Sequence, residues 1–99
     1  MRLDPHQADR IRKEVHALFG PRARVWLFGS RVDDAARGGD IDLLVSVPEP
    51  LLHPARLASR LGARLQLALG EQRIDVVLEA PNLQPLPIHR LAHEHGVLL

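Results

Sequence analysis

The chain has no cysteine, few aromatic residues and no long apolar run among its 99 residues. Without cysteine, neither disulfides nor thiolate metal ligands can hold the fold together, which is the composition expected of a cytoplasmic protein. The apolar runs are interrupted by His or Arg and fall far short of the roughly 20 residues that a membrane span needs. Residues 1–20 also lack the apolar segment of a secretory signal. We therefore expect a protein that acts in the cytoplasm, away from the membrane.

The chain also lacks an excess of charge of either sign. Thirteen Lys and Arg residues face twelve Asp and Glu residues, for a net charge of +1. No part of the chain carries the basic excess of a dedicated nucleic-acid binder, so direct nucleic-acid binding is not expected. The 45% hydrophobic and 25% charged residues are typical of a globular protein. A chain of this length supports one core, and residues 1–99 are predicted to form a single domain.

Three segments have the apolar spacing of amphipathic helices. Asp4 and Pro5 are a good helix start, and Gly20 ends this first helix. The second helix is predicted over residues 54–69, and a short third helix over residues 88–94.

Three other segments have the composition of strands, and they alternate with the helices. They cover residues 25–28, 40–47 and 73–78. Residues 31–36 could add one or two helical turns between the first two strands. The order of elements predicts a mixed α/β fold.

Acidic residues occupy unusual places in two of these strands. Asp40 and Asp42 head the second strand and Asp75 lies within the third, although aspartate is disfavoured in strands. Residues two apart on a strand project from the same face, so Asp40 and Asp42 point together. Such carboxylates repel each other unless they are protonated or bridged by a cation such as Mg²⁺. The alternative is that Asp40 caps the preceding turn and Asp42 is a solvated strand end.

A glycine and a serine follow the first strand directly. Gly29 lets the backbone approach a ligand closely, and Ser30 begins a turn whose exposed amides suit phosphate groups. Arg31 and Arg37 lie in the same connection and could neutralise phosphate charge. The alternatives are that Ser30 caps a helix and that both arginines are solvated.

The motif Phe28-Gly29-Ser30, followed after nine residues by Asp40-Ile41-Asp42-Leu43, resembles the signature of the DNA polymerase β-type nucleotidyltransferase superfamily. Asp75, within Arg73-Ile74-Asp75-Val76, matches the third carboxylate of that signature on a later strand. The short chain and its C-terminal residues resemble the minimal nucleotidyltransferases, which include the MNT-domain antitoxins paired with HEPN-domain toxins.

The resemblance implies a role for each matching residue. Asp40 and Asp42 would coordinate two Mg²⁺ ions, and Asp75 would complete the site as a ligand or base. The nucleotide's phosphates would be held by Gly29 and Ser30, with Arg31 and Arg37 as further contacts.

The same motifs predict how the strands run. Because the first strand must end at the site while the second and third begin there, the first pair is antiparallel and the second pair parallel. We expect a small three-stranded mixed sheet with its helices on one side, as in the polymerase β-type fold.

By this resemblance the expected activity is transfer of AMP from ATP to a hydroxyl of a partner protein. The partner would be a HEPN-type toxin in a hetero-oligomer, because 99 residues leave no room for an acceptor-binding domain. The tyrosine that the family carries near its C-terminus is absent, so the chain cannot be modified on a tyrosine of its own. The alternative function is a non-catalytic module that neutralises the toxin by contact.

Three histidines near the C-terminus invite a metal-site interpretation. His89 and His93 lie one helical turn apart and His95 follows, but a further zinc ligand is missing. We expect these histidines to lie on an exposed face, one that a partner could contact.

Overall fold

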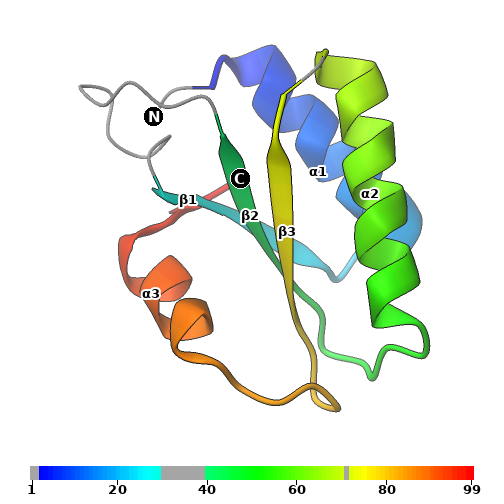
Figure 1. Ribbon diagram of the computed structural model, residues 1–99, viewed down its shortest axis with the longest axis vertical. Coiled ribbons are helices and arrows are strands. Elements are labelled where there is room, and N and C mark those ends of the chain that lie inside the picture. The colour runs from blue at the N-terminus through cyan, green and yellow to red at the C-terminus, as the bar shows by residue number, and fades with distance from the viewer. Residues whose placement is uncertain (1–2, 30–39, 71) are drawn as a thin grey trace.

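A computed structural model describes residues 3–29, 40–70 and 72–99 of the chain. The predicted turns at 31–36 and three predicted phosphate contacts, namely Ser30, Arg31 and Arg37, lie outside the described residues. The elements along the chain are α1 (Pro5–Phe19), β1 (Arg24–Phe28), β2 (Ile41–Ser46), α2 (Pro54–Leu69), β3 (Ile74–Glu79), α3 (Pro87–His95) and β4 (Val97–Leu98) (Figure 1). The three predicted helices and the three predicted strands are all present, so the mixed α/β class is confirmed.

The strands form one sheet in the order β3-β2-β1-β4. β1 runs antiparallel to β2, and β2 runs parallel to β3, with α2 as the crossover. This topology confirms the prediction made from the motifs. The prediction of three strands was one short, because Val97–Leu98 pairs antiparallel with the free edge of β1. A two-residue strand has no periodicity of its own and is formed only by its tertiary pairing.

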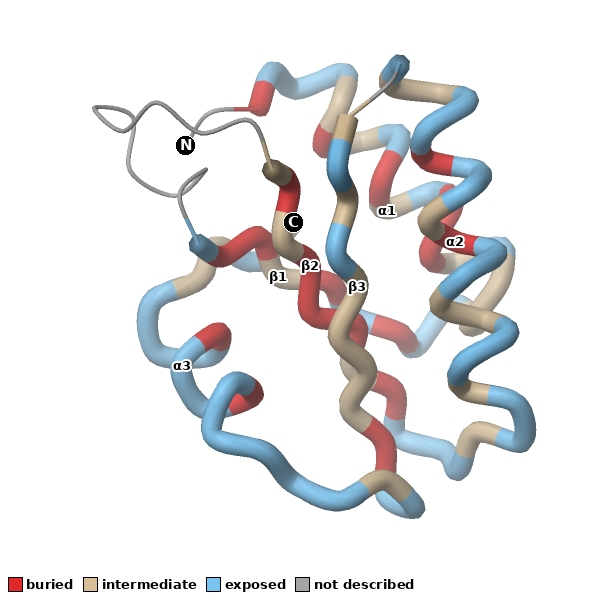
Figure 2. Tube along the Cα trace, viewed as in Figure 1, coloured by how far each residue is buried: buried red, intermediate tan, exposed pale blue. Residues whose placement is uncertain are grey.

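The two faces of the sheet are covered by different helices. Alternate strand residues, among them Leu27, Leu43 and Val76, pack with α1 and α2 in the main core (Figures 1 and 2). The opposite face carries a smaller cluster, in which Leu44 packs with Ala92 of α3. The expectation that all helices lie on one side of the sheet was therefore wrong for α3. This helix is short, so the spacing of its apolar residues says little about which face of the sheet it covers.

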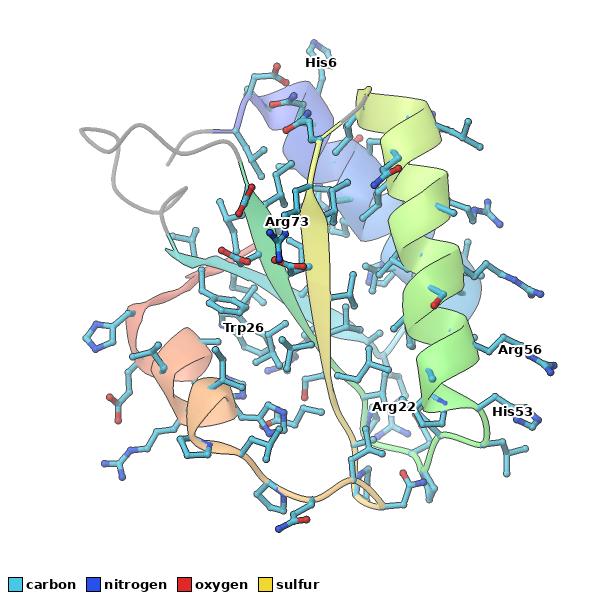
Figure 3. The ribbon with its side chains drawn as sticks, in the orientation of Figure 1. His6, Arg22, Trp26, His53, Arg56 and Arg73 are labelled. Carbon is cyan, nitrogen blue, oxygen red and sulfur yellow. The ribbon has the colours of Figure 1, made fainter. Side chains whose placement is uncertain are left out.

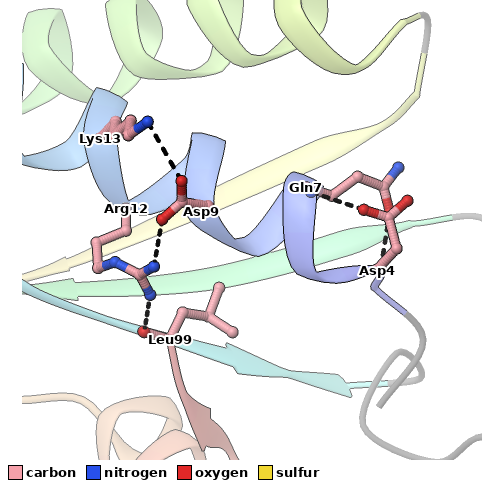
Figure 4. A network of polar contacts seen from close by, with 6 residues as sticks. All are labelled: Asp4, Gln7, Asp9, Arg12, Lys13 and Leu99. Atoms are coloured by element: carbon pink, nitrogen blue, oxygen red, sulfur yellow. Dashed lines mark hydrogen bonds and ion pairs between the residues drawn. The ribbon is translucent and has the colours of Figure 1, made fainter.

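The start of α1 and the end of the chain are both fixed by polar contacts (Figure 4). The Gln7 N–H donates to the Asp4 carboxylate at 2.9 Å, and the Asp4 N–H donates to the Gln7 side chain, which forms a capping box. Arg12 donates to the Leu99 carbonyl and to Asp9, so α1 is tied to the residue that follows β4. The predicted helix start at Asp4 is confirmed.

None of the helices that the structure describes is long and apolar enough to cross a bilayer.

Candidate active site

The end of β1 meets the beginnings of β2 and β3 at one end of the sheet. Phe28 is directly opposite Asp42 in the antiparallel pair, and Asp42 is directly beside Asp75 in the parallel pair. Because paired residues project from the same face, both carboxylates lie on the face that α3 partly covers. The strand directions thus bring together two acidic residues that are 33 positions apart in the sequence.

Asp42 and Asp75 repel each other where they meet. Asp42 is half-buried, and this desolvation raises its pKa. The charge of Asp75, the charge of Asp40 and a hydrogen bond with Asp75 raise the pKa of Asp42 further. A carboxylate whose pKa is raised by neighbouring negative charge is also one that gains from a bound cation.

Asp40 stands just before β2 and takes a smaller part in this cluster. It is close enough for its charge to raise the pKa of Asp42, but it precedes the first residue of the strand ladder. Among the described residues, no three His, Asp or Glu side chains are grouped so as to hold a metal ion by themselves. The structure therefore pairs two of the three predicted ligands and places the third near them.

This donor set still fits the predicted cation. Mg²⁺ is usually bound in proteins through one or two carboxylates, and it completes its octahedron with water and substrate phosphates. Asp42 and Asp75 provide two carboxylates whose mutual repulsion a cation would relieve.

Gly29 lies directly against this pair. Its φ of +78° is in the left-handed region, and a Cβ built on it would lie only 2.3 Å from Oδ2 of Asp42. Any side chain at position 29 would therefore displace the Asp42 carboxylate. The predicted approach of this backbone to a ligand stays a prediction, and the close neighbour of Gly29 in the structure is Asp42.

Arg73 is a site residue that the sequence analysis did not select. Its Nε lies 3.5 Å from Oδ2 of Asp75. Its positive charge lowers the pKa of Asp42 and so partly offsets the effects of burial and of the two neighbouring carboxylates. Figure 3 shows its side chain between β2 and β3. The signal was available, because Arg73 precedes Asp75 by two residues and such residues share a strand face.

The histidines of α3 lie away from these carboxylates. His95 is exposed, as predicted, and His93 is 37% exposed, whereas His89 is only 5% exposed. The prediction of an exposed face was therefore wrong for His89. His89 and His93 both approach Glu79, at the end of β3 opposite to Asp75.

A mixed sheet whose first strand ends in a glycine turn beside two carboxylates on the next strands is the arrangement of a polymerase β-type nucleotidyltransferase. A comparison with protein-family models matches residues 8–94 to the nucleotidyltransferase domain. The chain belongs to this family, and its general activity is nucleotidyl transfer. A comparison with curated proteins found no match.

Proposed function

We propose that this protein is a Mg²⁺-dependent nucleotidyltransferase that transfers AMP from ATP to a hydroxyl group of a partner protein. The observation that carries this proposal is the pairing of Asp42 with Asp75 beside the backbone of Gly29. A purely structural sheet end gains nothing from two adjacent like charges, because their repulsion costs stability.

The residues of the site have separate roles in an in-line displacement at the α-phosphate. The attacking hydroxyl forms a bond to the α-phosphorus while the bond to the β-phosphate oxygen breaks, so pyrophosphate leaves with that electron pair. The hydroxyl proton passes to a carboxylate, and Asp75 is suited to this role because it is the more exposed member of the pair. Gly29 gives the triphosphate room beside Asp42, since no side chain stands there.

Asp42 and Asp75, with Asp40 nearby, would hold the magnesium ions. When bound, these ions neutralise the triphosphate and stabilise the entering and leaving oxygens. Arg73 lies beside the same carboxylates and adds a fixed positive charge at the edge of the site. Positioning and electrostatics, rather than covalent chemistry by the protein, then supply most of the rate enhancement.

A separate partner protein is the acceptor in this proposal. The family resemblance points to a HEPN-type toxin, bound in a hetero-oligomer in the cytoplasm, with this chain as its antitoxin. The described residues form one compact sheet with three helices and include no second domain that could hold an acceptor. The proposal assigns the acceptor surface to another chain.

The proposal is tested by incubating the protein with the product of the adjacent gene, ATP labelled on the α-phosphate and Mg²⁺. The label is expected on the partner, and it should be lost with Asp42→Asn. Glu79→Gln is the matched control, because it removes a carboxylate from the far end of the same sheet face. Labelling that survives in Asp42→Asn would overturn the proposed chemistry.

The same experiment decides between catalysis and simple binding. If the partner is neutralised equally well by the native protein and by Asp42→Asn, and no label is transferred, the chain acts by contact. If neutralisation follows labelling, the transferase is the antitoxin activity.

A further inference from the structure

A cavity of about 550 Å³ lies at the far end of the sheet face that carries the acidic pair. Its polar lining comes from Arg22, Arg24, Ser46 and His93, and Trp26 supplies an aromatic wall. Figure 3 shows Trp26 between the sheet and α3. The volume falls within the roughly 300–1,000 Å³ that small-molecule pockets span.

The strand register explains why these groups meet. Arg24 is directly opposite Ser46 across the β1–β2 pair, and Trp26 is opposite Leu44. Directly opposed residues project from the same face of a sheet. The cavity therefore opens on the α3 side, where His93 completes its wall.

The cavity is separate from the acidic pair. Ser46 lies four residues beyond Asp42 on β2, or about 13 Å at the usual rise of a strand. Between them lies an apolar row made of Trp26, Leu44 and Val77, which packs against α3. A ligand of the cavity is thus distinct from a nucleotide bound at the acidic pair.

Two of the lining side chains, those of Ser46 and His93, are held in place by Glu79. The Ser46 hydroxyl donates to Oε1 of Glu79 at 2.8 Å, and Nε2 of His93 lies 2.8 Å from the same oxygen. The rings of His93 and Trp26 meet edge to face, with centroids 4.4 Å apart. This wall is organised before any ligand arrives, which lowers the entropy cost of binding.

The basic side chains that line the cavity differ in whether they have an acidic partner. Arg22 is paired with Glu49 at 2.8 Å, and His93 is paired with Glu79. The Arg24 side chain has neither a hydrogen bond nor an ion pair with any residue that the structure describes. An unpaired guanidinium is a suitable partner for a phosphate or carboxylate, which it can contact with two parallel hydrogen bonds.

We propose that this cavity binds a planar aromatic ligand that carries one anionic group, of the nucleoside monophosphate class. The ring packs against Trp26, and the anionic group pairs with Arg24. This site does not depend on the transferase function proposed above, since it shares no residue with the acidic pair.

The test uses the intrinsic fluorescence of Trp26, the single tryptophan of the chain. AMP is titrated into the full chain in the presence of EDTA, and adenosine and inorganic phosphate are titrated separately. We expect a saturable change with AMP and much weaker responses to adenosine and to phosphate alone. An absence of saturable change at millimolar AMP, or equal affinity for adenosine and AMP, would overturn the proposal.

Variants locate the ligand. Arg24→Gln should weaken AMP binding about tenfold, the effect of losing a hydrogen bond to a charged group, and Arg24→Lys should restore part of it. Arg60→Ala is the matched control, because Arg60 is an exposed arginine on α2, which covers the opposite face of the sheet. Asp42→Asn should also leave the titration unchanged. Binding that is lost in Asp42→Asn or retained in full by Arg24→Gln would contradict this site.

Discussion

The two ends of one sheet face shift the pKa of their carboxylates in opposite directions. At one end, Asp42 faces Asp75, and burial together with these like charges raises the pKa of Asp42. At the other end, Glu79 is also partly desolvated, but hydrogen bonds from His93 and Ser46 outweigh this and lower its pKa. Hydrogen bonds thus stabilise the charged form of Glu79, whereas like charges meet at Asp42 and Asp75, where we propose that a cation binds.

The largest difference between the two ends should appear in activity. Asp42→Asn and Asp75→Asn should each reduce nucleotidyl transfer more than the roughly 10–100-fold that losing an outer partner of a metal ligand costs, because the proposed function makes these two residues metal ligands. Glu79→Gln should retain transfer near the native rate. The measurement is the initial rate of label transfer from ATP. Equal losses of transfer rate in Asp42→Asn and Glu79→Gln would contradict a catalytic role that is confined to the acidic pair.

A change at Gly29 tests the acidic pair through the backbone. Gly29→Ala places a Cβ 2.3 Å from Oδ2 of Asp42 and also forces alanine into φ of +78°. The backbone strain costs about 1–2 kcal/mol, and the displaced carboxylate should reduce transfer at least tenfold.

Gly70→Ala separates the two effects of that substitution. Gly70 has a φ of +93° but no atom within 4 Å of its virtual Cβ, so it carries the strain without the contact. We expect both variants to lose stability in thermal melts and only Gly29→Ala to lose activity. Native activity in Gly29→Ala would show that the Asp42 carboxylate position does not matter.

The pH dependence of stability should have opposite signs at the two ends. The folded pKa of Glu79 is below its unfolded value of 4.5, so its contribution is present above pH 4.5 and is lost as the pH falls through the folded pKa. The folded pKa of Asp42 is above its unfolded value of 3.8, so its contribution is present below pH 3.8 and is lost as the pH rises through the folded pKa.

Denaturant unfolding between pH 3 and pH 7, without metal, measures both slopes. Glu79→Gln should remove a rise in stability with increasing pH, and Asp42→Asn should remove a fall. At neutral pH, Asp42→Asn is therefore expected to be at least as stable as the native protein. A less stable Asp42→Asn at neutral pH would contradict the repulsion at the acidic pair.

The smallest expected effect concerns Arg73, which partly compensates the acidic pair. Arg73→Ala removes a cation 3.5 Å from Asp75, so the metal-free pair should bind Mg²⁺ about two- to fivefold more tightly, as expected for an exposed ion pair worth up to about 1 kcal/mol. Arg73→Lys keeps the charge and should stay near the native affinity. Calorimetric titration with Mg²⁺ alone measures this, and weaker binding by Arg73→Ala would show that Arg73 supports the site in another way.

The elements of the fold were largely predictable because local signals and tertiary packing agree. The Asp4 cap and the glycine at position 20 bound α1 as the sequence indicates, and the glycine at position 70 bounds α2. The strand directions followed from where Gly29 and the acidic residues must meet. β4 and the position of α3 were missed, since two residues of strand and nine of helix carry too little pattern to specify a partner.

The acidic residues of the site could be predicted from the motif, but the other charged and polar side chains around them could not. The pairing of Asp42 with Asp75 follows from the motif, whereas Arg73 and the burial of His89 depend on which side chains a particular face gathers. His89 is a polar residue at a position that faces the sheet, where an apolar residue would usually be expected. Polarity alone therefore predicted exposure wrongly.

The most direct test is the titration of the Asp42 carboxyl group by ¹³C NMR, without metal and with saturating Mg²⁺. We predict a pKa above the ordinary aspartate value for Asp42 in the metal-free protein, and a clear decrease of this pKa when Mg²⁺ binds beside it. An ordinary pKa that Mg²⁺ leaves unchanged would contradict this prediction.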